Sequence, residues 1–228
     1  MSKAFFAVIM VMCVSCAAWA SFVDSSLITV TPSGNWPGSE AVNLINGSGF
    51  QPDQTVNADP TDTQNWLCNI DDGRWLPQWR EGTYLHNTSP SGVVYTDGWI
   101  QFEFATAQEI SNMWVWNYNN PNYLGRGWES VAVDYSTDGT TWTRMGGGDT
   151  YLTFAQAPGT NGYVCNNIID FGGIAVKKVV LNLGWATGNY GDGSHAGLSE
   201  VRFEVVPEPA TMLLLGLGGL GMLRRKRA

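Results

Sequence analysis

The stretch from Trp116 to Arg126 combines side chains that recognise a polyhydroxylated ring. An aromatic face suits the C–H surface of such a ring, whereas planar amides and a guanidinium suit its hydroxyl groups. The residues that offer these groups are Asn117, Asn119, Tyr123 and Arg126. They predict a sugar-binding loop.

Three further residues are candidates for the rim of this site. Trp75 and Trp79 belong to a long Trp-rich segment, and His195 follows a Gly-rich turn. A purely structural alternative stays open, in which the amides of the loop bond its own backbone and Arg126 packs over Trp128.

The sequence gives little support for a catalytic site or for a zinc site. Outside the first 20 residues the histidines are His86 and His195 and the cysteines are Cys68 and Cys165, without the close spacing of zinc sites. Ser194 adjoins His195, but sequence neighbours rarely form a nucleophile–base pair. Asp71 and Asp72 lack a second carboxylate partner of the kind that glycosidases use. We predict a protein that is not an enzyme.

The N-terminus has the order of a secretory signal peptide. Lys3 precedes an apolar run from Ala4 to Val14, and Ala18-Trp19-Ala20 supplies the small residues of a cleavage site. We expect residues 1–20 to be removed after Ala20.

The C-terminus, residues 207–228, forms a second targeting segment. Pro207-Glu208-Pro209 is followed by an apolar run from Ala210 to Leu223 and by a basic cluster that starts with Arg224 and Arg225. The run predicts a transmembrane helix with the basic end in the cytoplasm, although it is shorter than the ~20 residues of a comfortable span.

This tail resembles the PEP-CTERM sorting signal of Gram-negative bacteria. The resemblance implies an exosortase-type processing enzyme as a partner, transient anchoring in the inner membrane, and release to the cell surface or extracellular matrix.

The exported part, residues 21–206, is acidic. It holds 7 basic and 19 acidic residues, a formal charge of about −12, which argues against nucleic acid as a partner. Its two cysteines predict a Cys68–Cys165 disulfide in an oxidising compartment, with two buried thiols as the alternative.

Residues 21–206 predict a single all-β domain. Strand-like runs recur between Gly, Asn, Asp and Pro residues, and Asp138-Gly139 predicts a turn after one of them. The runs are 99–104, 110–116, 130–136, 175–183 and 200–206. We expect one β-sandwich of the jelly-roll type.

Five segments in order resemble the discoidin or coagulation-factor type C family of galactose-binding-like domains. They are 41–49, 98–104, 110–119, 135–142 and 197–203. The resemblance implies a jelly-roll sandwich whose end loops bind sugars, lipids or protein, and a structural calcium ion. By this resemblance Asn46, Ser48 and Glu200 would hold the calcium, although Asn46 stands where relatives carry Asp. The alternative is that Asn46 lies in a plain turn and that Glu200 pairs with Arg202 or meets solvent.

Together these features predict an exported, non-enzymatic surface or matrix protein that binds extracellular polysaccharide or another glycan. Two alternatives remain: an adhesive matrix protein with protein partners, and a small glycan-active enzyme.

Overall fold

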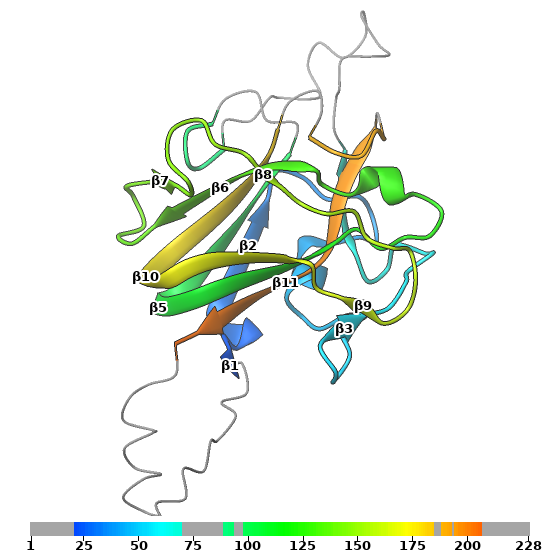
Figure 1. Cartoon of the computed structure of the whole chain (residues 1–228), viewed down its shortest axis with the longest axis horizontal. Coiled ribbons are helices and arrows are strands. Elements are labelled where there is room, and N and C mark those ends of the chain that lie inside the picture. The colour runs from blue at the N-terminus through cyan, green and yellow to red at the C-terminus, as the bar shows by residue number, and fades with distance from the viewer. Residues whose placement is uncertain (1–20, 70–88, 94–97, 185–187, 193, 207–228) are drawn as a thin grey trace, which may run out of the picture.

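The computed structural model describes residues 21–69, 89–93, 98–184, 188–192 and 194–206 (Figure 1). In these ranges the regular structure consists of β-strands and three short 3-10 helices. The strands are β1 (Ser21–Phe22), β2 (Ile28–Pro32), β3 (Thr55–Val56), β4 (Trp66–Asn69), β5 (Trp99–Asn117), β6 (Ser130–Ser136), β7 (Thr143–Arg144), β8 (Leu152–Thr153), β9 (Tyr163–Val164), β10 (Asn167–Leu183) and β11 (His195–Val205). The helices are η1 (Ser25–Leu27), η2 (Ala41–Leu44) and η3 (Leu124–Arg126).

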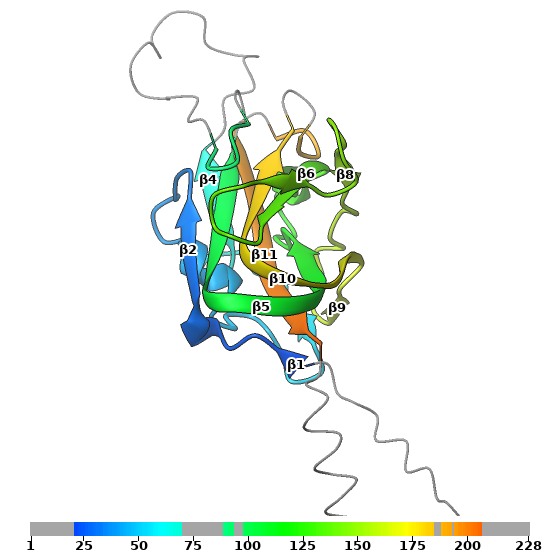
Figure 2. The ribbon, with the colours of Figure 1, turned by 90° about the vertical axis from the view of Figure 1, so that its left-hand side faces the viewer.

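Two long strands, β5 with 19 residues and β10 with 17, run antiparallel and connect both layers of the sandwich. Their pairing shifts register between Asp170 and Ile174, where Gly172 and Gly173 have positive φ angles of 65° and 77°. Glycine adopts these angles without a steric penalty, and such bulges bend a strand. Figure 2 shows the resulting curvature of β5 and β10.

The bend divides the strand pairs between two layers. The first half of β5 pairs with β2, and the matching half of β10 pairs with β6. The second half of β5 pairs with β11, which also carries β1 and β4 at its two ends. β11 therefore begins beside β4 and ends beside β1.

The main core lies between the layers. Its fully buried members include Trp66, Phe102, Phe104, Trp128 and Phe203, and edge-to-face contacts join Phe203 to both other phenylalanines. Such pairs add stability beyond the area that they bury. This core fixes the ends of the strands from which the surface loops leave.

A smaller cluster lies on the outer face of β5. The β3–β9 ribbon and its flanking loops cover Trp116, whose indole N–H donates to the carbonyl of Tyr163 at 3.1 Å. The outer face of this layer is thus partly buried around Trp116.

The predicted all-β sandwich is confirmed, with local differences. The runs 99–104 and 110–116 belong to one strand, β5, because both halves keep β10 as a neighbour. The turn at Asp138-Gly139 is present: Gly139 has φ 84°, and Asp138 accepts hydrogen bonds from the N–H groups of Thr140 and Thr141, both at 2.7 Å.

Among the residues that the structure describes, no helix has the length and apolar character to cross a membrane. The predicted signal peptide and the predicted tail helix lie outside the described residues.

Candidate functional site

The candidate site lies where η3 meets the segment that leads into β11, at one end of the sandwich (Figure 1). Backbone hydrogen bonds join the two segments: the N–H of Asp192 donates to Gly125 O at 3.2 Å, and the N–H of Tyr190 donates to Gly127 O at 3.0 Å. The side chain of Asn189 donates to the carbonyls of Asp192 and His195 at 2.7 and 2.9 Å. Residues 189–192 are therefore held against η3 and the start of β11.

Arg126 occupies the centre of this junction. Its Nε donates to Asp192 Oδ2 at 3.1 Å, and its Nη1 lies 3.3 Å from Asp62 Oδ2. The guanidinium carbon lies 4.0 Å from the centre of the Tyr123 ring, in cation–π geometry. Tyr123 is 48% exposed, so its ring contacts the guanidinium of Arg126 and remains accessible to solvent.

A second exposed aromatic, Trp36, flanks the other side. Its ring lies edge-on to the imidazole of His195, with centroids 4.7 Å apart, and it is 41% exposed. The backbone N–H of Trp36 donates to the backbone carbonyl of Leu67 at 2.7 Å. The loop of Trp36 is therefore fixed to β4, the neighbour of β11. His195 Nδ1 lies 3.8 Å from Asp192 Oδ1, which links this aromatic to the Arg126 junction.

Hydrogen bonding holds Asp192 as a carboxylate. Burial by itself would raise the pKa of Asp192. Hydrogen bonds outweigh this effect and lower the pKa well below its usual range. They come from the side chains of His195 and Arg126 and from the backbone N–H groups of Ser194 and His195. Burial would likewise lower the pKa of Arg126, yet its bonds to Tyr118 and Asp192 outweigh it and raise the pKa. Both groups are therefore charged across the physiological range.

Asp62 positions Arg126 from the opposite side. It has a positive φ of 62°, a backbone conformation that is uncommon outside glycine and that Asp tolerates better than most residues. Its carboxylate accepts hydrogen bonds from the hydroxyl of Tyr118 and, at 2.7 Å, from the amide of Asn120. Burial and the bond to Asp62 raise the pKa of Tyr118. This network fixes the orientation of the guanidinium.

We name the connected residues Trp36, His195, Asp192, Arg126, Asp62 and Tyr123 the aromatic–polar strip.

Asn117 and Asn119, predicted to bond sugar hydroxyls, are instead fully buried. Asn117 donates to Trp128 O and Ala155 O at 2.7 and 2.9 Å and accepts from the N–H groups of Tyr118 and Trp128 at 2.9 and 2.8 Å. Asn119 donates to Thr160 O at 2.9 Å and accepts from Gly159 N–H at 2.8 Å. Because the backbone occupies their amides, the prediction that they contact a ligand is wrong in this structure.

The structure brings three predicted residues together, namely Tyr123, Arg126 and His195. Trp75 and Trp79 lie outside the described residues. Sequence reasoning missed Trp36, Asp62 and Asp192 as site residues. Trp36 did carry a signal, because a Trp between Asn35 and Pro37-Gly38 sits in a turn-forming context where burial is hard to achieve.

The predicted calcium residues do not form the oxygen shell that calcium requires. Calcium takes about six to eight oxygen ligands, whereas the amide oxygen of Asn46 accepts the N–H of Ser48 at 2.7 Å. Glu200 is fully buried, and Arg202 Nη2 lies 2.6 Å from its Oε1. Burial raises the pKa of Glu200, against the lowering effect of Arg202. The described residues also contain no group of three or more His, Cys, Asp or Glu side chains suited to a metal.

The predicted Cys68–Cys165 disulfide is not formed in the structure. Cys68 belongs to the main core, where its thiol donates to Ala196 O at 3.3 Å. Cys165 belongs to the outer cluster, where its thiol donates to Val115 O at 3.4 Å and burial raises its pKa to about 11. The two thiols are buried in different clusters, which matches the alternative given above.

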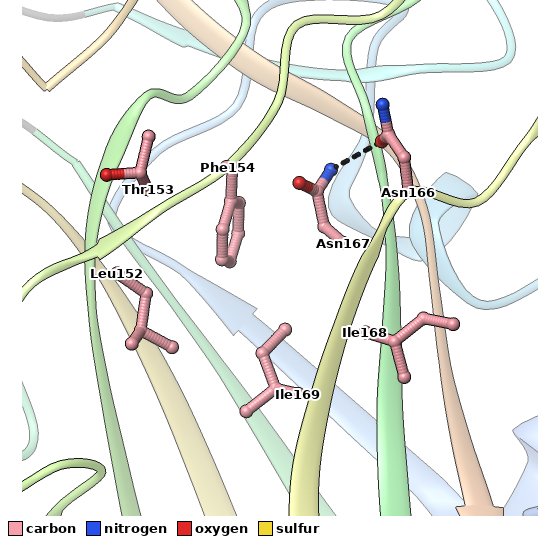
Figure 3. Close-up of a pocket in the computed structure, with 7 residues that line it drawn as sticks. All are labelled: Leu152, Thr153, Phe154, Asn166, Asn167, Ile168 and Ile169. Atoms are coloured by element: carbon pink, nitrogen blue, oxygen red, sulfur yellow. Dashed lines mark hydrogen bonds between the residues drawn. The ribbon is translucent and has the colours of Figure 1, made fainter.

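A hollow of about 230 Å³ lies between β8 and the start of β10 (Figure 3). Phe154, Asn167 and Ile169 point into it, whereas Ile168 points to the other side of β10. Asn167 accepts from Ala155 N–H at 2.6 Å and donates to Val115 O at 3.2 Å. Because backbone groups occupy this amide, the hollow offers fewer ligand-binding groups than the aromatic–polar strip.

Comparison with known proteins bears first on the C-terminal tail. Residues 205–227 match the model of the PEP-CTERM protein-sorting motif, which confirms the predicted sorting signal that includes Pro207, Glu208, Pro209, Arg224 and Arg225. No curated protein sequence matches the chain significantly.

Several solved structures have a similar arrangement of strands. One is the family 32 carbohydrate-binding module of C. perfringens NanJ in complex with galactose, with 11% identity, a TM-score of 0.48, and coverage of 81% of this chain and 98% of that chain. Another is a fucose-binding module of Streptococcus pneumoniae, with 9% identity, a TM-score of 0.48, and coverage of 78% and 91%. A third is CBM32-3 from a family 31 glycoside hydrolase of Clostridium perfringens, with 14% identity, a TM-score of 0.49, and coverage of 81% and 95%. At these low identities and scores, the ligand chemistry of the chain has to be judged from its own side chains.

Proposed function

We propose that this protein is an exported, non-enzymatic carbohydrate-binding protein, and that the aromatic–polar strip is its binding site. The carrying observation is the placement of two exposed rings, Trp36 and Tyr123, at the two ends of one connected set of polar side chains. Aromatic faces bind the C–H surfaces of a sugar, and the polar groups between them bind its hydroxyls.

The charges of the strip favour a neutral sugar over an acidic one. One guanidinium, Arg126, is held between two carboxylates, Asp62 and Asp192, at 3.3 and 3.1 Å. The carboxylates already compensate its charge, so a carboxylated sugar would meet more repulsion than attraction. A carboxylate oxygen that also faces the ligand can accept a hydrogen bond from a sugar hydroxyl. A neutral glycan supplies such hydroxyls without adding a negative charge.

The same arrangement supports binding rather than hydrolysis. A glycosidase needs one carboxylic acid that stays protonated and a second that acts as base or nucleophile. The pKa of Asp192 is lowered, and Asp62 is bonded to Tyr118, Asn120 and Arg126. Glu200 has a raised pKa but is fully buried and cannot reach a glycan.

Export is supported by the sorting motif and by the signal peptide that the sequence predicts. We infer that an exosortase-type enzyme processes the tail after transient anchoring in the inner membrane. β11 would then orient the site, because its first residue, His195, lies in the strip and its last residue, Val205, comes shortly before the tail in the sequence. At ~3.3 Å per residue, its 11 residues separate the two by roughly 30 Å. The strip would face away from the membrane.

Glycan-array screening of the purified protein tests this function, followed by titration of the best ligand. Trp36→Ala and Tyr123→Ala should each weaken binding by roughly 1–3 kcal/mol, about 5- to 150-fold, because each loses a stacking face. Tyr151→Ala is a matched control, since Tyr151 is 44% exposed and also lies against an arginine, Arg144 at 5.7 Å, in another part of the domain. Absence of binding to any glycan, or equal losses in all three variants, would contradict the proposal.

A further inference from the structure

Glu200 and Arg202 form an ion pair on the outer face of β11. Residues two apart on a strand point to the same face, and here Nη2 of Arg202 lies 2.6 Å from Oε1 of Glu200. The side chain of Glu200 is 0% exposed and that of Arg202 is 15% exposed. Burial raises the pKa of Glu200, so this carboxyl group stays charged only beside a positive partner, and an unpaired buried charge is strongly destabilising.

The loop that follows η2 closes over the guanidinium of Arg202. Gly47 has φ 81°, and a Cβ atom built on it would lie 3.3 Å from Arg202 Nη2. The guanidinium carbon lies 4.7 Å from the centre of the Phe50 ring, in cation–π contact. The loop thus provides a close-fitting backbone position and an aromatic face for this cation.

The polar groups of the same loop are turned toward the loop itself. Asn46 accepts from Ser48 N–H at 2.7 Å and donates to Asn43 Oδ1 at 3.3 Å. Within the described part of the chain, neither carboxylate oxygen of Glu200 has a hydrogen-bond partner, so the ion pair with Arg202 is the interaction that compensates this buried charge. A metal ion at this carboxylate would have to share the space with a guanidinium 2.6 Å away from Oε1, where two cations in a low-dielectric site repel strongly.

We propose that Arg202 supplies the cation of this site from the chain itself, so that the sandwich joins its first loop to its last strand without calcium. The pair links β11 to the loop between η2 and β3 in the way that a bound ion would link them. This inference is independent of the proposed glycan site, which lies at the start of β11.

Thermal unfolding of the purified protein in excess EGTA and in calcium chloride tests the proposal. The wild-type melting temperature should be the same in both, because the cation position is filled. Arg202→Met keeps most of the side-chain length but removes the charge. Its melting temperature in EGTA should fall by roughly 6–20 °C, as expected when a buried pair loses one partner in a domain of this size.

A double variant keeps the proposal testable if Arg202→Met fails to fold. Glu200→Gln combined with Arg202→Met removes both charges and should recover a large part of the lost melting temperature, because no uncompensated carboxylate remains. A calcium-dependent rise in the wild-type melting temperature would overturn the proposal. So would a melting temperature of Arg202→Met equal to that of the wild type, or a double variant no more stable than Arg202→Met.

Discussion

Replacement of Asn117 by alanine should act on folding and leave the ligand site unaffected. Asn117 lies at the end of β5 and is fully buried. Its amide makes four hydrogen bonds of 2.7–2.9 Å with the backbone of Tyr118, Trp128 and Ala155. Asn117→Ala removes all four at once and adds no replacement.

The magnitude follows from the groups that lose a partner. Two N–H donors, those of Tyr118 and Trp128, are left unbonded in a buried setting, and each costs about 1–3 kcal/mol. The loss of free energy at the carbonyl acceptors is smaller, because the carbonyl of Ala155 retains a long contact of 3.5 Å with the amide of Asn167. A total of roughly 3–6 kcal/mol would lower the melting temperature by roughly 6–24 °C in a domain of this size.

Thermal and urea unfolding, followed by circular dichroism, measure this loss, and titration with the glycan at a temperature where the variant is folded measures affinity. Asn122→Ala is the matched control, because Asn122 belongs to the same loop and is exposed; its stability should change by no more than about 0.5 kcal/mol. A variant of Asn117 with wild-type stability and lost glycan binding would refute the assignment of this amide to the backbone.

Three further predictions concern other residues. Asp192→Asn should flatten the acid side of the stability profile: the folded-state pKa of Asp192 is lowered, so its contribution is complete above about pH 4 and is lost as pH falls further. Urea midpoints of wild type and variant between pH 7 and pH 3 check this, and parallel curves would contradict it. Gly197→Ala should prevent normal folding, because its Cβ would lie 2.3 Å from the backbone oxygen of Trp66; wild-type yield and melting temperature would be the contrary result. Mass spectrometry of the native product should find Ser21 first and Arg224 absent, and an intact chain would contradict processing at both ends.

Local sequence patterns were sufficient for several strands and for the sorting motif at the C-terminal end. A strand needs only alternating or continuous apolar residues between turn-forming residues, and the run 130–136 coincides with β6. The tail was recognisable for a similar reason, since its proline–acid–proline motif, apolar run and basic cluster are contiguous in the chain. A contiguous signal does not depend on how the chain folds.

Burial and partnership were decided by the tertiary structure. Sequence alone could not tell whether Asn117 would face solvent or the backbone of Trp128, because the answer depends on where residues 128 and 155 return to the end of β5. The same holds for Cys68 and Cys165, which are placed in separate clusters by the β3–β9 ribbon and the main core.

The candidate site shows this division within one set of residues. Tyr123 and Arg126 were found from the sequence because they share a loop of suitable composition, whereas Trp36 and Asp62 are far from that loop in sequence. They reach it because β4 pairs with β11 and holds the loop of Trp36 beside His195, and because Asp62 adopts a positive φ that turns its carboxylate toward Arg126. The sequence alone determined the side-chain types of the site, and only the tertiary structure determined which of them meet, because strand pairing between distant segments sets those distances.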